Sequence, residues 1–238
     1  MKVIILSFCL FSLSTAWGFN SPFLPAWPGS SIPNSHIVDD EGLIIRGMEP
    51  RKHLQDLITL EVDHVLIFKK ETRNEVRRQK ERLIELGFSE NQIYEIPFRW
   101  KDYESFQIAC EQTIEALKLL RMAKTKKEKI YFHCTVGEDR TGHLSGLYRL
   151  LTEEISIDDV FHEDLCEKGF ERGNPRKPRV VVDGIRNELS VLFFEMAELF
   201  LEKKLTLNHK DLSIELCDRK WNQKRKTPIC RPSSKIQN

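Results

Sequence analysis

Ten consecutive residues, His133 to Gly142 (HCTVGEDRTG), bring together a thiol, a guanidinium and two glycines. They lie between an apolar segment that predicts a strand and an apolar segment that predicts a helix. A loop in that position directs several backbone N–H groups inward and forms a nest for an anion the size of phosphate, reinforced by the helix dipole. Gly137 permits the tight turn and the close approach to the ligand that such a nest requires.

The other side chains of this loop suggest nucleophilic chemistry on a phosphate. Arg140 can grip two phosphate oxygens with its planar fork. The same positive field is expected to lower the pKa of Cys134 and to make its thiolate the nucleophile. His133 is expected to order the loop by hydrogen bonding, and the Thr141 hydroxyl to donate to the sulfur. The rest of the phosphate-binding loop is Thr135, Val136, Gly137, Glu138 and Asp139. The competing interpretation is a structural buried cysteine beside a chance glycine and arginine.

Thiolate attack on a phosphomonoester also needs a proton for the leaving oxygen. Asp102 follows a predicted strand, within Trp100-Lys101-Asp102. A loop at the C-terminal end of a neighbouring parallel strand would face the phosphate nest. We therefore expect Asp102 to be the general acid, and afterwards the base that activates water. Glu104 and Asp139 are the next candidates for this role.

These two motifs resemble those of the cysteine-dependent protein tyrosine phosphatase superfamily, with its H-C-x-x-G-x-x-R-[ST] loop and its W-P-D general-acid loop. Lys101 stands where that family has proline, and the resemblance covers about residues 40–170. It implies an α/β domain with a central, mostly parallel sheet flanked by helices. It also implies a phosphocysteine intermediate, with no metal and no organic cofactor.

The branch of the superfamily depends on pocket depth and rim charge. The chain is short for a classical tyrosine-specific enzyme and shows no K-N-R-Y stretch, which favours a dual-specificity or atypical bacterial member. Exported members include enzymes that resemble phytases and act on inositol polyphosphates. Glu138 and Asp139 inside the loop count against inositol hexakisphosphate. Candidates for a basic substrate rim are Arg46, Lys69, Lys70, Arg99 and Lys101.

Strands alternating with helices predict a single α/β domain over residues 40–204, after an irregular, proline-rich lead-in at residues 19–39. Apolar runs predict strands at residues 43–47, 63–68, 92–98 and 129–132. Helical periodicity and punctuation predict helices at residues 50–60, 72–86, 103–122, 141–151, 157–166 and 184–203.

The N-terminus predicts export. A short positive start, an apolar block of about 12 residues and small residues up to Gly18 are typical of a cleaved secretory signal peptide, residues 1–18. The block is too short to span a bilayer comfortably, so we expect no membrane span after cleavage and a periplasmic or secreted protein.

Cleavage would remove Cys9 and leave five of the six cysteines in a compartment that permits disulfides. Cys110 and Cys166 lie on apolar faces of predicted helices and are expected to pack in the core. Cys217 and Cys230 are expected either to form a disulfide or to remain two free thiols. His64, His143 and His162 show no metal-site spacing with the cysteines, so no metal site is predicted.

Composition excludes other classes of protein. Lys and Arg total 37 against 36 Asp and Glu, a net charge of +1, which does not indicate a nucleic-acid binder. Positive charge concentrates in the last 21 residues, and the segment 205–238 is expected to be a basic, poorly ordered tail. A monomer is expected.

These observations favour an exported phosphomonoesterase, foremost a protein tyrosine or dual-specificity phosphatase. One alternative is an inositol polyphosphate phosphatase. Another is a phospho-ligand binding module without useful turnover, which the Lys101 replacement motivates. A thiol redox protein ranks far below these, because the chain lacks a C-x-x-C motif.

Overall fold

The computed structural model describes residues 21–99 and 106–236, which are built around a five-stranded sheet in the order β1-β2-β5-β3-β4. The strands are β1 (His36–Ile37), β2 (Ile44–Gly47), β3 (His64–Phe68), β4 (Ile93–Ile96) and β5 (Ile130–His133). Only β1 runs antiparallel to its neighbour among these five strands. The predicted α/β fold with a mostly parallel central sheet is therefore confirmed.

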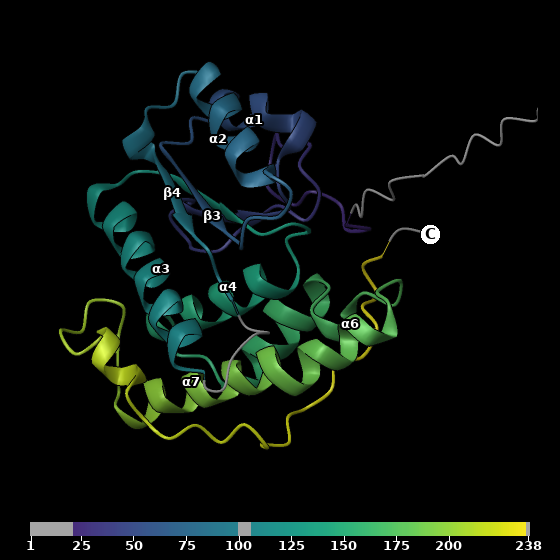
Figure 1. The fold of residues 1–238 in the computed structure, drawn as a ribbon, viewed down its shortest axis with the longest axis vertical. Coiled ribbons are helices and arrows are strands. Elements are labelled where there is room, and N and C mark those ends of the chain that lie inside the picture. Colours follow the sequence, from purple (N-terminus) through teal and green to yellow (C-terminus); the bar gives the residue numbers. More distant parts are fainter. Residues whose placement is uncertain (1–20, 100–105, 237–238) are drawn as a thin grey trace, which may run out of the picture.

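Helices cover both faces of this sheet (Figure 1). On one face lie the short helix α1 (Leu54–Thr59) and the charged helix α2 (Glu75–Glu85). On the other lie α3 (Gln107–Lys126), α4 (Asp139–Thr152) and α7 (Ser190–Glu202). Two short helices, α5 (Ile157–Val160) and α6 (Arg179–Gly184), belong to the chain that connects α4 to α7.

The three central strands, β2, β3 and β5, are mostly apolar because both of their faces are buried. Alternate residues along a strand point to opposite faces. Accordingly Ile45, Ile67 and Tyr131 join the hydrophobic cluster beneath α1 and α2. Ile44, Leu66 and Phe132 join the larger cluster beneath α3, α4 and α7. This alternation also decides the direction of the one charged side chain of β2, Arg46, which points to the same face as Ile44.

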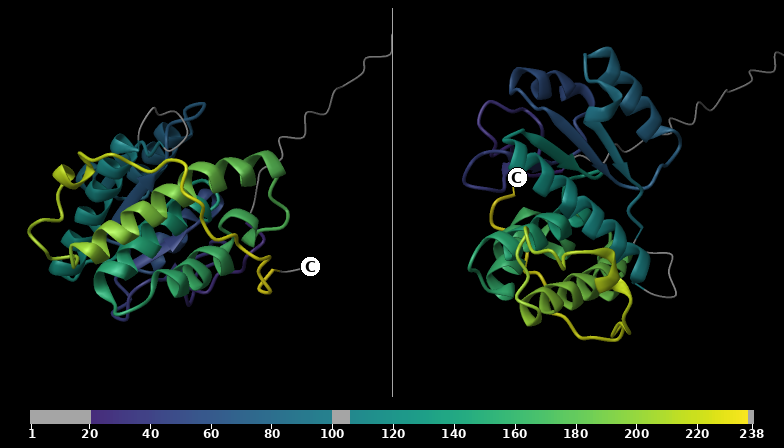
Figure 2. Two further views of the ribbon diagram at one scale, coloured as in Figure 1. Left: turned by 90° about the horizontal axis from the view of Figure 1, so that it is seen from below. Right: turned by 90° about the vertical axis from the view of Figure 1, so that its left-hand side faces the viewer.

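The C-terminal segment differs from the poorly ordered tail that its composition predicts. Residues 205–236 run along α7 and return toward α6 (Figure 2). Leu205, Leu212 and Trp221 are buried against the main core, and Arg225 pairs with Glu198 and Glu195. Although Ile214 and Ile229 are exposed, the buried apolar residues attach the segment to the core, so residues 205–236 form a strap along the domain.

The strap is also covalently attached. Cys217 forms a disulfide with Cys110 of α3, and Cys230 forms one with Cys166. Cys110 and Cys166 do pack in the core, as predicted, but they do so as the disulfide partners of the strap, and the Cys217–Cys230 pair does not form. Proximity in sequence favoured that pair, whereas the course of the strap carries each cysteine to a distant partner. Among the described cysteines, Cys134 alone is free.

The predicted signal peptide falls on residues outside the described ranges. Within residues 21–99 and 106–236, no helix has the length and apolar character needed to cross a membrane. Residues 21–35 contain neither helix nor strand, yet Ser21 and Asn34 are buried and reach the loop after β5.

Candidate active site

The loop from Cys134 to Arg140 lies at the carboxyl edge of the sheet, where the chain leaves β5 and enters the first turn of α4. Since β5 lies between β2 and β3, the ends of those strands flank the loop. Gly137 adopts φ +71°, and a Cβ there would lie 2.4 Å from the carbonyl carbon of Gly47 and 2.5 Å from the Met48 nitrogen. Both conformation and space therefore require glycine at this position.

Two buried donors hold the Gly137 carbonyl. Asn34 Nδ2 donates to it at 3.0 Å and Arg46 Nη2 at 2.9 Å. Arg46 Nη1 also donates to Ser145 Oγ at 2.6 Å and to the Asp164 carbonyl at 2.8 Å. Arg46 is fully buried, so it does not line a substrate rim as predicted. Its position on β2 directs it to the same face as Ile44, beneath α4, where it supports the loop.

Lys69 is also no rim residue. Its side chain is buried, and its Nζ pairs with Glu49 at 2.7 Å and with Glu75 at 2.9 Å. The charge is thus neutralised where β3 leads toward α2. Lys70 and Arg99 are exposed at the ends of β3 and β4, while Lys101 lies outside the described residues.

Cys134 is buried, and three influences compete for its pKa. Burial by itself raises the pKa of the thiol, because it disfavours the charged form. The positive charge of Arg140 and hydrogen bonds with Thr141 outweigh burial and lower the pKa of Cys134 below its ordinary value. The Cys134 N–H also donates to Thr141 Oγ1 at 3.0 Å. The environment therefore favours a thiolate, as the sequence predicted.

Arg140 extends within the loop itself. Its Nη2 donates to Thr135 Oγ1 at 3.0 Å, and Arg140, Thr135 and Val136 are each half-buried. The guanidinium is thus held near the sulfur and remains partly accessible, which suits a group that binds phosphate oxygens.

His133 orders the loop in its neutral form. Burial lowers the pKa of His133 to about 3. Its Nδ1 lies 2.9 Å from the Cys134 carbonyl oxygen and its Nε2 lies 2.7 Å from Gln79 Nε2. A neutral ring meets both partners when Nδ1–H donates to the carbonyl and Nε2 accepts from the amide. The role of Gln79 was not predicted, although this residue shares the buried stripe of α2 with Val76 and Leu83.

Glu138 and Asp139 bond groups outside the loop. Lys177 Nζ pairs with Glu138 Oε2 at 3.2 Å and with Asp139 Oδ1 at 2.5 Å. The side chain of Lys177 is only 5% exposed. Further donors to the two carboxylates are Ser21 Oγ, Asn174 Nδ2 and the Glu171 N–H, each at 3.0 Å. Lys177 offsets one of the two negative charges, so the acids count less against a highly anionic substrate than the sequence suggested.

The predicted general acid, Asp102, lies outside the described residues, together with Trp100 and Glu104. The chain leading to it is described: β4 is parallel to β3, which is parallel to β5, so all three end at the same edge of the sheet. Arg99 follows β4 there, and its N–H donates to Gln112 Oε1 at 3.0 Å. Within the two described ranges, no group of three or more His, Cys, Asp or Glu residues is arranged to hold a metal ion.

No family model and no curated protein matches the chain. The core catalytic domain of the PP-IP phosphatase SIW14 from S. cerevisiae aligns with 65% of this chain and 83% of its own, at 20% identity and a TM-score of 0.45. The PTP-2 phosphatase of Cydia pomonella aligns with 53% of this chain and 75% of its own, at 15% identity and a TM-score of 0.42. PTPMT1 aligns with 71% of this chain and 99% of its own, at 12% identity and a TM-score of 0.44.

Proposed function

We propose that this chain is a phosphomonoesterase that acts through a phosphocysteine intermediate and belongs to the protein tyrosine phosphatase superfamily. The observation that carries the proposal is the environment of Cys134. A thiol with a lowered pKa lies at the end of the central strand, under a glycine-dependent loop that also holds Arg140 and Thr141. That combination suits nucleophilic attack on a bound phosphate.

In the proposed reaction the Cys134 thiolate attacks phosphorus, and the bond from phosphorus to the leaving oxygen breaks. Asp102 gives that oxygen its proton. Arg140 and the loop N–H groups stabilise the charge that develops on the phosphoryl oxygens. Water, activated by the Asp102 carboxylate, then hydrolyses the phosphocysteine and restores the thiolate. Neither step requires a metal or an organic cofactor.

We propose further that the protein is exported after cleavage of residues 1–18. The two disulfides, Cys110–Cys217 and Cys166–Cys230, support this, because stable disulfides are typical of exported proteins. Periplasmic and secreted destinations are equally compatible with them.

Phosphoproteins are the first proposed substrate class, in keeping with a protein tyrosine or dual-specificity phosphatase. Inositol polyphosphates are the second candidate, and one observation favours them. The acids that counted against such an anion, Glu138 and Asp139, are both paired with the buried Lys177.

The test is phosphate release by residues 19–238 from an aryl phosphate, phosphotyrosine and phosphothreonine peptides, and inositol hexakisphosphate. Cys134→Ser is expected to abolish release from every substrate. Asp102→Asn is expected to lower kcat about 100-fold or more with substrates whose leaving group needs a proton. Glu104→Gln, a matched change two residues further along the chain, is expected to retain activity.

The outcomes separate the candidate functions. Equal losses in the Asp102 and Glu104 variants would remove Asp102 from its assigned role. A wild-type protein that binds phosphoesters without releasing phosphate would instead be a phospho-ligand binding module. Alkylation of Cys134 that phosphate and vanadate fail to block would contradict the phosphate nest itself.

A further inference from the structure

Gln79 of α2 is a buried polar residue with one of its two polar atoms unpaired. Its side chain lies on the face of α2 that packs on the sheet, and the residue is only 5% exposed. Its Nε2 lies 2.7 Å from His133 Nε2. Its Oε1 has no hydrogen-bond partner among residues 21–99 and 106–236. An unpaired buried acceptor destabilises a fold, so packing alone does not explain an amide at this position.

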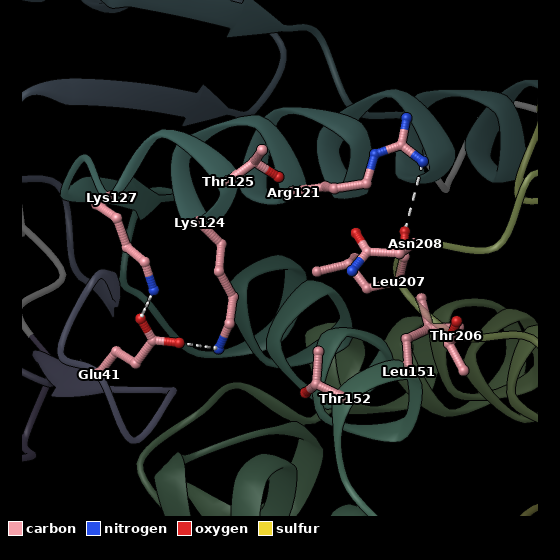
Figure 3. A pocket seen from close by; sticks show the side chains of 10 residues that line it. All are labelled: Glu41, Arg121, Lys124, Thr125, Lys127, Leu151, Thr152, Thr206, Leu207 and Asn208. Atoms are coloured by element: carbon pink, nitrogen blue, oxygen red, sulfur yellow. Dashed lines mark hydrogen bonds and ion pairs between the residues drawn. The ribbon is translucent and has the colours of Figure 1, made fainter.

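Polar groups elsewhere in the molecule satisfy each other. In a hollow of 470 Å³ at the carboxyl ends of α3 and α4, Lys124 and Lys127 both point to Glu41 and pair with it (Figure 3). Lys124 also pairs with Asp39. These two lysines are compensated within the fold, and we assign that hollow no role. The amide oxygen of Gln79 is not compensated in this way, and what its amide gains is the contact with His133.

Only one arrangement of the His133 ring satisfies both of its neighbours. The Cys134 carbonyl oxygen, 2.9 Å from Nδ1, can only accept, so Nδ1 carries the proton. Burial and the positive charges of Lys69 and Arg140 lower the pKa of His133 to about 3, so the ring is neutral and Nε2 has a lone pair. The Gln79 amide nitrogen supplies the donor that this lone pair needs.

The alternative arrangements place lone pairs against each other. With the amide of Gln79 reversed, Oε1 would face the lone pair of His133 Nε2. If the ring then moved its proton to Nε2, Nδ1 would face the Cys134 carbonyl without a proton. The amide therefore fixes the tautomer of the ring, and the tautomer fixes the bond to the carbonyl.

The carbonyl that His133 holds belongs to the first peptide group of the phosphate loop. This peptide group, between Cys134 and Thr135, is trans, so its carbonyl and its N–H point in opposite directions. A carbonyl directed at the buried ring turns the Thr135 N–H away from that ring. Thr135 also accepts from Arg140, whose Nη2 lies 3.0 Å from Thr135 Oγ1. The Thr135 N–H is one of the donors that an anion nest in this loop would use.

We propose that Gln79 is a positioning residue for the phosphate loop: its amide fixes the tautomer of His133, and His133 in turn directs the Thr135 N–H at the bound phosphate. The inference rests on the proposed phosphatase function and adds to it a residue of α2, outside the loop. Gln79 acts through the ring and is not itself a catalytic residue.

The first measurement is the nitrogen NMR spectrum of the His133 ring in protein with isotopically labelled histidine. The His133 signals are identified by their loss in His133→Asn. At neutral pH we expect Nδ1 to carry the proton and Nε2 to be unprotonated and hydrogen-bonded. In Gln79→Met, which keeps a long side chain without a donor, the Nε2 signal should move to the position of a nitrogen without a hydrogen bond. A wild-type ring with its proton on Nε2 overturns the inference.

The second measurement is the protection of Cys134 from iodoacetamide by inorganic phosphate, which reports on the nest without requiring turnover. Gln79→Met should weaken this protection about tenfold, as expected for one hydrogen bond to a charged group. The value of kcat/KM for an aryl phosphate should fall by about tenfold or more. The matched control, Val76→Ala, removes buried atoms from the same face of α2 but no partner of His133. In the control both values should stay within about twofold of wild type.

Equal protection in wild type and Gln79→Met overturns the inference. An equal loss in Val76→Ala also overturns it, because packing of α2 would then account for the effect. Should the wild type release no phosphate from any substrate, the proposed function fails by itself. The protection assay and the spectrum still decide the role of Gln79 in that case: about tenfold weaker protection in Gln79→Met supports it, and unchanged protection contradicts it.

Discussion

At the scale of single residues, the pKa of Cys134 depends on a balance of charges to which residues outside the loop contribute. Arg140 favours the thiolate, whereas burial and the nearby Asp139 carboxylate oppose it. Lys177, from a segment nearly 40 residues further along the chain, pairs with that carboxylate at 2.5 Å. A positive charge outside the loop thus offsets a negative charge within it.

Replacing Lys177 by methionine should therefore raise the pKa of Cys134, because the Asp139 charge would act on the sulfur without compensation. The measurement is the rate of iodoacetamide alkylation as a function of pH, whose midpoint should move upward. Lys177→Arg keeps the charge and should keep the midpoint. An unshifted midpoint in a folded Lys177→Met protein would contradict this role, and it would do so whether or not the protein is a phosphatase.

At the scale of elements, α3 and α4 pack around a buried histidine. His143 of α4 is fully buried, with Nε2 lying 3.1 Å from Thr113 Oγ1 of α3 and its ring stacked on Phe98. Burial lowers the pKa of His143 to about 3, while in the unfolded chain a histidine titrates near pH 6.5. As the pH falls below about 6.5, the unfolded state gains a proton that the native state does not bind. The stabilisation is complete above that pH and is lost progressively toward pH 3.

The urea midpoint of the protein should accordingly fall as the pH is lowered from 7 to 4. His143→Gln retains a polar side chain opposite Thr113 and removes the titrating group, so the fall should be shallower in this variant. His36 and His133, whose pKa values burial also lowers to about 3, should account for part of the remaining slope. Parallel curves for wild type and variant would show that His143 does not contribute.

Across the whole molecule, the strap and its two disulfides connect distant parts of the chain. The disulfides join residues 107 and 64 positions apart. Each should stabilise the fold by about 4–5 kcal/mol on chain-entropy grounds. The two disulfides differ in what lies nearby. Next to Cys166, the Asp164 carbonyl accepts a hydrogen bond from Arg46, and the Lys168 carbonyl accepts one from Asn34. Arg46 and Asn34 are the two donors that hold the Gly137 carbonyl.

The double variant Cys166→Ala/Cys230→Ala should therefore lose both stability and activity. Its matched control, Cys110→Ala/Cys217→Ala, opens the longer covalent loop but leaves the segment behind the phosphate loop attached. We expect both variants to melt at lower temperature, and kcat/KM below the melting range to fall several-fold more in the first. A larger loss of activity in the control would contradict this assignment.

Sequence alone determined the features that depend on neighbouring residues. The thiol, the glycine and the guanidinium of the loop are contiguous, so their spacing indicated their chemistry before any contact was known. Most strands and helices could likewise be predicted, because hydrophobic periodicity is a local property. The two-residue β1 and the short α6 were not predicted.

Only the tertiary structure decided which residues support that loop and which do not. Arg46 and Lys69 have the charge expected of a substrate rim, yet both are buried among partners that the sequence does not place beside them. The sequence likewise gave no sign that Lys177 neutralises Glu138, or that Cys110 and Cys166 bond the strap. These partners lie up to 118 positions apart, as in the hydrogen bond from Arg46 to the Asp164 carbonyl. Their meeting depends on which buried surfaces the whole chain brings together, and local patterns carry no information about that.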